Sequence, residues 1–161
     1  MLPSWAGFQV RYGDQGAARA AAPADGAVRL SISPGDVEPG TPPTAEQVAA
    51  FRHLMANEAT IADAVAHALV EYCPGEAYDG DDEVLLGVRE PDDLRPLVRL
   101  IGVHLRNIAK DGVGCVGFEF DCAWDGEHGA GVVTHLGRVI ATGQADCSFT
   151  VWIARQGLDR Q

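Results

Sequence analysis

The sequence is poor in lysine, and it carries many more acidic than basic residues. Lys110 is the single lysine among twelve basic residues, which stand against 23 acidic ones for a formal net charge of -11. An acidic surface repels phosphate backbones and anionic lipid headgroups, so we expect neither nucleic acid nor a membrane as a partner. The same charge favours encounter with a basic protein. Taken alone, it is explained most simply by solubility.

Long apolar runs are missing as well. No stretch approaches the roughly 18 apolar residues that cross a bilayer, and the first residues lack the basic and apolar regions of a secretory signal. We therefore expect a cytoplasmic protein whose thiols are reduced. Its 161 residues, 47% of them hydrophobic, are enough for a single domain spanning 1–161 with a core of its own. The four cysteines include no CxxC pair: Cys73, Cys115, Cys122 and Cys147.

Alternating apolar residues predict a mostly antiparallel sheet of about five to seven strands. The first two strands are expected at 8–12 and 28–32, as an antiparallel pair. Further strands are expected at 97–108, 114–124, 131–135 and 138–142. Leu136 and Gly137 suit a tight hairpin between the last two. The apolar run 149–153 is compatible with either a strand or a short helix.

The spacing predicts one long helix, kinked or divided near 57–60, between the first strand pair and the others. Thr44 and Gln47 have the capping-box pattern at its start, and apolar residues recur at helical spacing as far as Tyr72. A short helical turn is expected at Pro91. Packed on one face of the sheet, the long helix would complete an α+β fold.

The alternation also assigns side chains to the two faces of the expected strands. In 97–108 it places Arg99 on the same face as Val103 and Leu105. In 114–124 it places Phe118 and Cys122 on one face, and it places a second set on the other: Cys115, Gly117, Glu119 and Asp121. Cys115 and Cys122 therefore face opposite ways and are not expected to share a bond or a zinc ion.

The segment 118–132 runs from a strand into a cluster of reactive side chains and glycines. Asp125, Glu127 and His128 are suitable ligands for a divalent ion, and a glutamate beside a histidine is also a suitable general base. A structural alternative has Asp125 capping a turn, Glu127 paired with an arginine, and His128 bonded to backbone. The spacing favours this alternative, because adjacent strand residues point opposite ways and no HExxH pair is present.

The sequence offers three other groupings of candidate site residues. A three-histidine zinc site of His104, His128 and His135 is a geometric alternative on neighbouring strands. The glycines at 126, 129 and 131 lie between strands with no basic residue until Arg138, which favours a bulge over a phosphate loop. A dense acidic loop lacks the glutamate spacing of an EF-hand and is suited to meeting a basic partner: Asp79, Asp81, Asp82 and Glu83.

The residues 122–132 resemble an uncharacterised group of bacterial domains with a C-x-W-D-x-E-H-G-x-G-V signature and a later G-x-A-D, which here is 143–146. The resemblance covers 28–149 and extends to the Glu46-Gln47 pair at the helix start. It implies a small cytoplasmic α+β domain of unknown function. It also implies a similarity to immunity or accessory proteins found near bacterial polymorphic toxins, and it assigns no catalytic residue.

From these observations we expect a non-catalytic, acidic protein-binding domain without a cofactor. The expected partner is a basic protein, and an immunity-type inhibitor of a basic toxin domain is the more specific form of this hypothesis. The expected surface combines the acidic loop with the 125–128 segment: Asp79, Asp81, Asp82, Glu83, Asp125, Glu127 and His128. The alternatives are a metal-dependent hydrolase that uses Asp125, Glu127 and His128, and a purely structural role for that segment.

Overall fold

The computed structural model describes residues 2–8, 28–32, 41–73 and 88–160. The strands are β1 (Arg29–Ile32), β2 (Val98–Lys110), β3 (Val113–Cys122), β4 (Asp125–His135) and β5 (Arg138–Gly143). The α-helices are α1 (Ala45–Ala56), α2 (Glu58–Tyr72) and α3 (Val151–Asp159), and the 3-10 helices are η1 (Pro3–Trp5), η3 (Pro91–Leu94) and η4 (Ala145–Ser148).

In the described part of the chain, the five strands form one mixed sheet in the order β1-β2-β3-β4-β5. The pairings from β2 to β5 are antiparallel, as expected, but β1 pairs with β2 in parallel. The strand predicted at 8–12 lies outside the described residues except for Phe8, which is not in a strand. The connection from β1 to β2 contains α1 and α2, and such a crossover is what parallel pairing requires.

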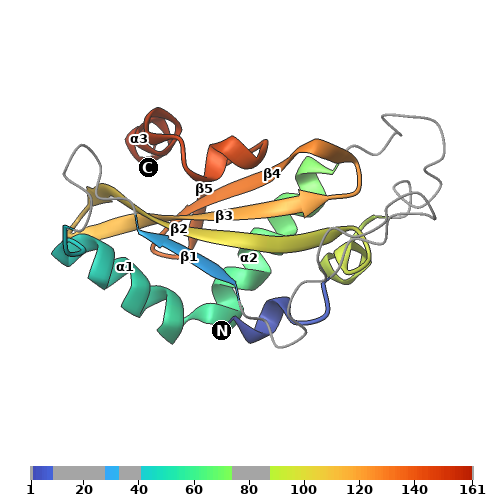
Figure 1. Cartoon of the computed structure of the whole chain (residues 1–161), viewed down its shortest axis with the longest axis horizontal. Coiled ribbons are helices and arrows are strands. Elements are labelled where there is room, and N and C mark those ends of the chain that lie inside the picture. The colour runs from blue at the N-terminus through green and yellow to red at the C-terminus, as the bar shows by residue number, and fades with distance from the viewer. Residues whose placement is uncertain (1, 9–27, 33–40, 74–87, 161) are drawn as a thin grey trace.

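Helices cover both faces of the sheet rather than one (Figure 1). α1, α2 and η1 lie on one side, whereas η4 and α3 lie on the other. The sequence prediction of one packed face missed this second layer, because it left 149–153 open between a strand and a helix. A layer on each face means that both sets of alternating side chains are partly buried, and the sheet separates two apolar clusters.

The expected long helix is two helices, divided at Asn57. The Asn57 amide Nδ2 donates to the His53 carbonyl at 2.9 Å, and its backbone N–H donates to the same carbonyl at 3.1 Å. A side chain that bonds its own backbone in this way competes with helix propagation. The start of α1 is as predicted: Thr44 and Gln47 form a capping box, and the Gln47 amide also donates to the Leu105 carbonyl at 3.1 Å.

Two tight hairpins hold the antiparallel strands in register. Leu136 and Gly137 join β4 to β5 with φ values of 49° and 77°, which confirms the predicted turn. Asp111 and Gly112 join β2 to β3 with φ values of 53° and 78°. Two successive positive φ values are typical of the turn type that matches strand twist.

An irregularity in β2 reverses the predicted direction of one arginine. The pairing of β2 with β3 shifts between Leu100 and Gly102, so Ile101 is an extra residue. Such a bulge exchanges the faces of all residues on one side of it. Val103 and Leu105 point into the core as predicted, whereas Arg99 lies on the opposite face and pairs with Asp121.

The cores on the two sides of the sheet follow the predicted alternation of β3. Phe118, Phe120 and Cys122 are buried beneath α1 and α2, and Trp5 of η1 packs edge-on to Phe120 with ring centroids 5.0 Å apart. Cys115 is buried on the opposite face with Ala154 and Leu158 of α3. The opposite orientation of Cys115 and Cys122 is therefore confirmed.

Glycines on the second face let η4 pack directly on the sheet backbone. A Cβ atom added to Gly117 would lie 1.7 Å from the Ser148 carbonyl oxygen, and one added to Gly131 would lie 2.6 Å from the Gln144 carbonyl oxygen. Real Cβ atoms do not approach backbone oxygen so closely. Only glycine at these two positions allows η4 its observed place.

We expect Gly117→Ala to lower the free energy of unfolding by about 3 kcal/mol, because the added methyl group must push η4 off the sheet. Gly126→Ala is the matched control, since nothing lies within 4 Å of a Cβ added there. It should stay within about 0.5 kcal/mol of the wild type. Urea unfolding of both variants measures the difference, and equal midpoints would contradict the proposed contact.

Candidate functional site

The predicted cluster at 125–128 lies in a wide bulge at the beginning of β4. Cys122 pairs with Asp125 and Phe120 pairs with Ala130, so one residue of β3 faces four residues of β4, Gly126 to Gly129. Gly129 has a φ of 63°, and an added Cβ would lie 2.4 Å from the Phe120 carbonyl oxygen. The prediction that glycines shape a bulge here is confirmed. We call residues 125–129 the 125–129 bulge.

Asp125 and His128 hold this bulge in shape. The backbone N–H of His128 donates to Asp125 Oδ1 at 2.9 Å, and the ring Nδ1 lies 3.0 Å from the same oxygen. An ionised carboxylate only accepts, so the proton is on Nδ1. Burial acts to raise the pKa of the Asp125 carboxyl, but the hydrogen bonds from His128 outweigh it and lower that pKa.

Glu127 lies in the same bulge, and its backbone N–H also donates to the Asp125 carboxylate. It is exposed, and no described arginine is within ion-pair distance of it, so the predicted arginine pair is absent from the described residues. Among those residues, no group of three or more histidine, cysteine, aspartate or glutamate side chains is arranged to hold a metal ion. The side chains of Asp125 and His128 thus bond to each other, and Glu127 is exposed beside them.

The three histidines of the alternative zinc site do not meet. His104 is buried, and its Nε2 lies 2.8 Å from Glu119 Oε2. His135 is also buried, and its Nε2 lies 3.0 Å from the Lys110 carbonyl oxygen. His128 is exposed in the 125–129 bulge. The three-histidine alternative therefore fails among the described residues, because each ring already has a different neighbour.

The predicted acidic loop is not among the described residues. It comprises Asp79, Asp81, Asp82 and Glu83, all within the range 74–87. Its contribution to a partner surface therefore stays a prediction.

The four thiols are in a state that disfavours nucleophilic chemistry at neutral pH. Burial raises the pKa of the Cys73, Cys115 and Cys147 thiols to about 11. Burial raises that of Cys122 to about 12. The thiolate is the reactive form, and its fraction near pH 7 is very small at such pKa values.

Sequence reasoning missed a polar cluster on the second face of the sheet. Glu119 Oε2 accepts from Arg29 Nη2 at 3.1 Å and lies 2.8 Å from His104 Nε2. Gly102 stands between Arg29 and Glu119 in the register and has no side chain to separate them. The ring of Phe149 packs edge-on to His104, with centroids 5.4 Å apart. The missing signal was the bulge at Ile101, which sets the register of this region.

This cluster is a set of satisfied polar contacts between three strands. His104 and Glu119 have side chains only 8% and 15% exposed, so their interaction is shielded from water. A second pair, Arg99 and Asp121, lies further along the same face with similar shielding. Partly buried pairs of this kind fix strand register, and removing one partner leaves the other without compensation.

The architecture defines the class of protein as an α+β domain with a five-stranded mixed sheet in the described residues. The chain matches the family described as domain of unknown function (DUF6985) over residues 23–149, and it belongs to that family. The comparison with curated proteins found no match, and the comparison with solved structures found none either. No helix in the described part of the chain is long and apolar enough to span a membrane.

We expect Asp125→Ala to lower the free energy of unfolding by about 1 kcal/mol at pH 7, because the bulge loses its acceptor. A lowered pKa in the folded state gives stability above the usual aspartate pKa of about 3.9, and this stability is lost as the pH falls through the folded-state pKa. The difference between wild type and variant should therefore shrink in acid. Urea unfolding at pH 7 and at about pH 3 tests this. A difference that is independent of pH would contradict it.

We expect Glu119→Ala to destabilise the fold by about 2 kcal/mol, since Arg29 and His104 both lose their acceptor. Glu119→Gln keeps one carbonyl oxygen in the same place and should cost less. Thermal unfolding of the two variants gives the comparison. If Glu119→Gln and Glu119→Ala destabilised the fold equally, loss of the acceptor oxygen would not explain the destabilisation.

Proposed function

We propose that this domain is a non-catalytic protein-binding domain that recognises a basic surface. The observation that carries the proposal is the 125–129 bulge. There, the Asp125–His128 contacts fix the backbone and Glu127 is left exposed. A carboxylate on a fixed backbone loses little freedom when it accepts a charge-assisted hydrogen bond from arginine or lysine. The bulge therefore suits recognition better than a mobile acidic chain would.

The overall charge supports the same function. A formal net charge of -11 raises the rate of encounter with a positively charged partner, and the effect weakens as salt is added. The acidic segment with Asp79 and Glu83 enters the proposed surface on its charge alone. The raised thiol pKa values of the four cysteines also support a non-catalytic role.

The more specific proposal is that the partner is a basic bacterial toxin domain and that this protein neutralises it. An immunity-type inhibitor needs no catalytic residues, because it acts by covering the partner's surface. An acidic inhibitor against a basic enzyme also gains a fast association rate, which is the property such a protein requires.

We expect Glu127→Lys to reduce recovery of the partner at least fivefold in affinity capture from a lysate of the source organism, because the lysine replaces attraction by repulsion. The wild type should recover one basic protein in near-equal amount, with less recovered at high salt. Mass spectrometry identifies and quantifies it.

Asp159→Lys is the matched control, since Asp159 is an exposed carboxylate at the end of α3 and the substitution changes the net charge equally. It should leave recovery close to that of the wild type. Equal loss in the two variants would show that only net charge matters, and no loss in either would remove the 125–129 bulge from the interface.

A further inference from the structure

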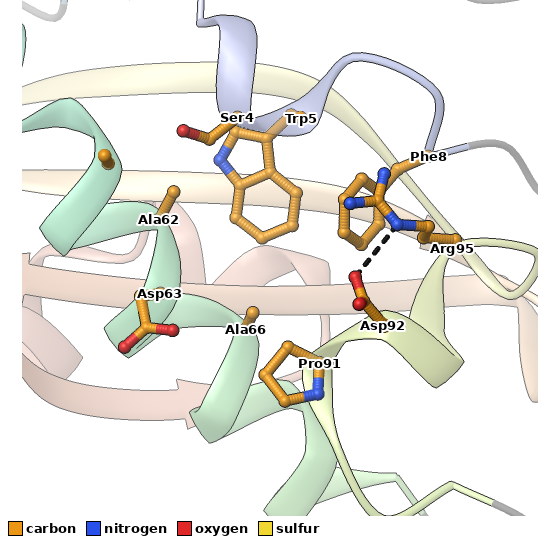
Figure 2. A pocket seen from close by; sticks show the side chains of 10 residues that line it. Ser4, Trp5, Phe8, Ala62, Asp63, Ala66, Pro91, Asp92 and Arg95 are labelled. Carbon is orange, nitrogen blue, oxygen red and sulfur yellow. Dashed lines mark hydrogen bonds and ion pairs between the residues drawn. The ribbon is translucent and has the colours of Figure 1, made fainter.

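A small open pocket lies on the opposite side of the sheet from η4, between η1, α2 and η3. Figure 2 shows the ring of Trp5 at its centre, with Ala62 and Ala66 of α2 to one side and Asp92 of η3 to the other. Its volume is ≈ 190 Å³. Pockets for drug-sized ligands and cofactors hold about 300–1,000 Å³, so this one has the size for a single side chain.

The walls of the pocket are fixed before anything enters it. Ser4 joins η1 to the beginning of α2, because its backbone N–H and its hydroxyl donate to the two carboxylate oxygens of Glu58 at 3.1 and 2.7 Å. Trp5 is buried and packs edge-on to both Phe8 and Phe120, at centroid distances of 5.0 Å. An occupant would therefore meet a formed cavity and would not have to order it.

One face of α2 supplies both an apolar floor and a carboxylate. Ala59, Ala62, Asp63 and Ala66 all line the pocket, and their spacing of three and four residues places them on the same side of the helix. The methyl groups leave a hollow where larger side chains would fill it. The hollow offers contact to methylene groups, while Asp63 offers an anion at the rim.

The charges around the pocket favour a cation. Asp63 and Asp92 stand against Arg95, whose Nε donates to Asp92 Oδ1 at 3.0 Å and whose guanidinium lies 4.8 Å from the centre of the Phe8 ring. These two contacts hold Arg95 at the end of the pocket formed by Asp92 and Phe8. The Nε2 atom of His67 lies 3.7 Å from Asp63 Oδ1, and the Asp63 side chain remains 70% exposed. Its carboxylate is accessible to a second donor.

We propose that this pocket receives an arginine side chain of the partner protein. The methylene stem would pack on Trp5 and the three alanines of α2 that line the pocket. The guanidinium would bond the carboxylates of Asp63 and Asp92. Arginine combines an apolar stem with a planar group that stacks on aromatic rings and bonds carboxylates. The inference rests on the proposed function, because it assigns the basic partner a specific anchoring residue.

The probe is N-acetyl-arginine amide, titrated into the full-length ¹⁵N-labelled protein and followed by NMR. We expect saturable shifts confined to residues 4–5, 59–66 and 91–95, including the Trp5 indole N–H. Asp63→Asn should weaken the binding at least threefold, because it removes a charge and retains the size. Asp159→Asn, on α3, should bind as the wild type does, and unchanged spectral dispersion verifies that both variants are folded.

Two further amides test the chemistry of the pocket. N-acetyl-norleucine amide has a similar stem without charge, and N-acetyl-glutamate amide has the opposite charge. If norleucine shifts the same resonances equally well, the pocket is only an apolar hollow, and the inference is overturned. It is also overturned if glutamate binds there in place of arginine through Arg95, or if arginine leaves the pocket resonances unshifted.

The outcome separates the two proposals. If Glu127→Lys abolishes capture of the partner and arginine amide does not enter the pocket, the pocket assignment fails and the proposed function stands. If arginine amide fills the pocket and capture from the lysate recovers no basic protein, the pocket binds arginine but the proposed function fails. Both results in the expected direction support a basic partner with an arginine anchor.

Discussion

The close contact between Gly117 and Ser148 is the constraint on which the second layer of the structure depends. It allows the backbone of η4 to lie directly on β3, where any side chain would hold the two apart. With η4 seated there, the chain leaves it at Phe149, whose ring packs edge-on to His104, and then enters α3. The contact thereby fixes both the cover of the polar cluster and the start of the last helix.

Close backbone contacts at glycines also explain the 125–129 bulge. Gly129 and Gly131 bring the beginning of β4 close to β3 and to η4, and the residues between the paired positions have no room within the ladder. They are pushed outward and bonded together by Asp125 and His128. A feature that looks like a reactive cluster in the sequence is thus explained first by packing, and packing leaves the Glu127 carboxylate exposed.

The sequence predicted the elements better than their connections. The capping box at Thr44, the Leu136 hairpin and the inward face of β3 were all readable, because each depends on residues close together in the chain. The direction of Arg99 was not, since a single extra residue at Ile101 exchanges the faces of a strand. Nor was the parallel pairing of β1, which follows from the path of two helices across the sheet. Asp125 caps a turn, as the structural alternative expected, but the His128 ring bonds the Asp125 carboxylate and not backbone. The three-histidine alternative fails among the described residues.

Three properties can be read from the sequence alone: the acidic charge, the alternation that builds the core side of β3, and the local signals that begin helices and close hairpins. These follow from composition and from periods of two or a few residues. Two groupings appear only in the folded chain: Arg29 and His104 share Glu119 across three strands, and Trp5, Ala62 and Asp92 line one pocket. The physical reason is that such groupings arise from packing between segments far apart in the chain, where the register and the layer are set by the whole fold.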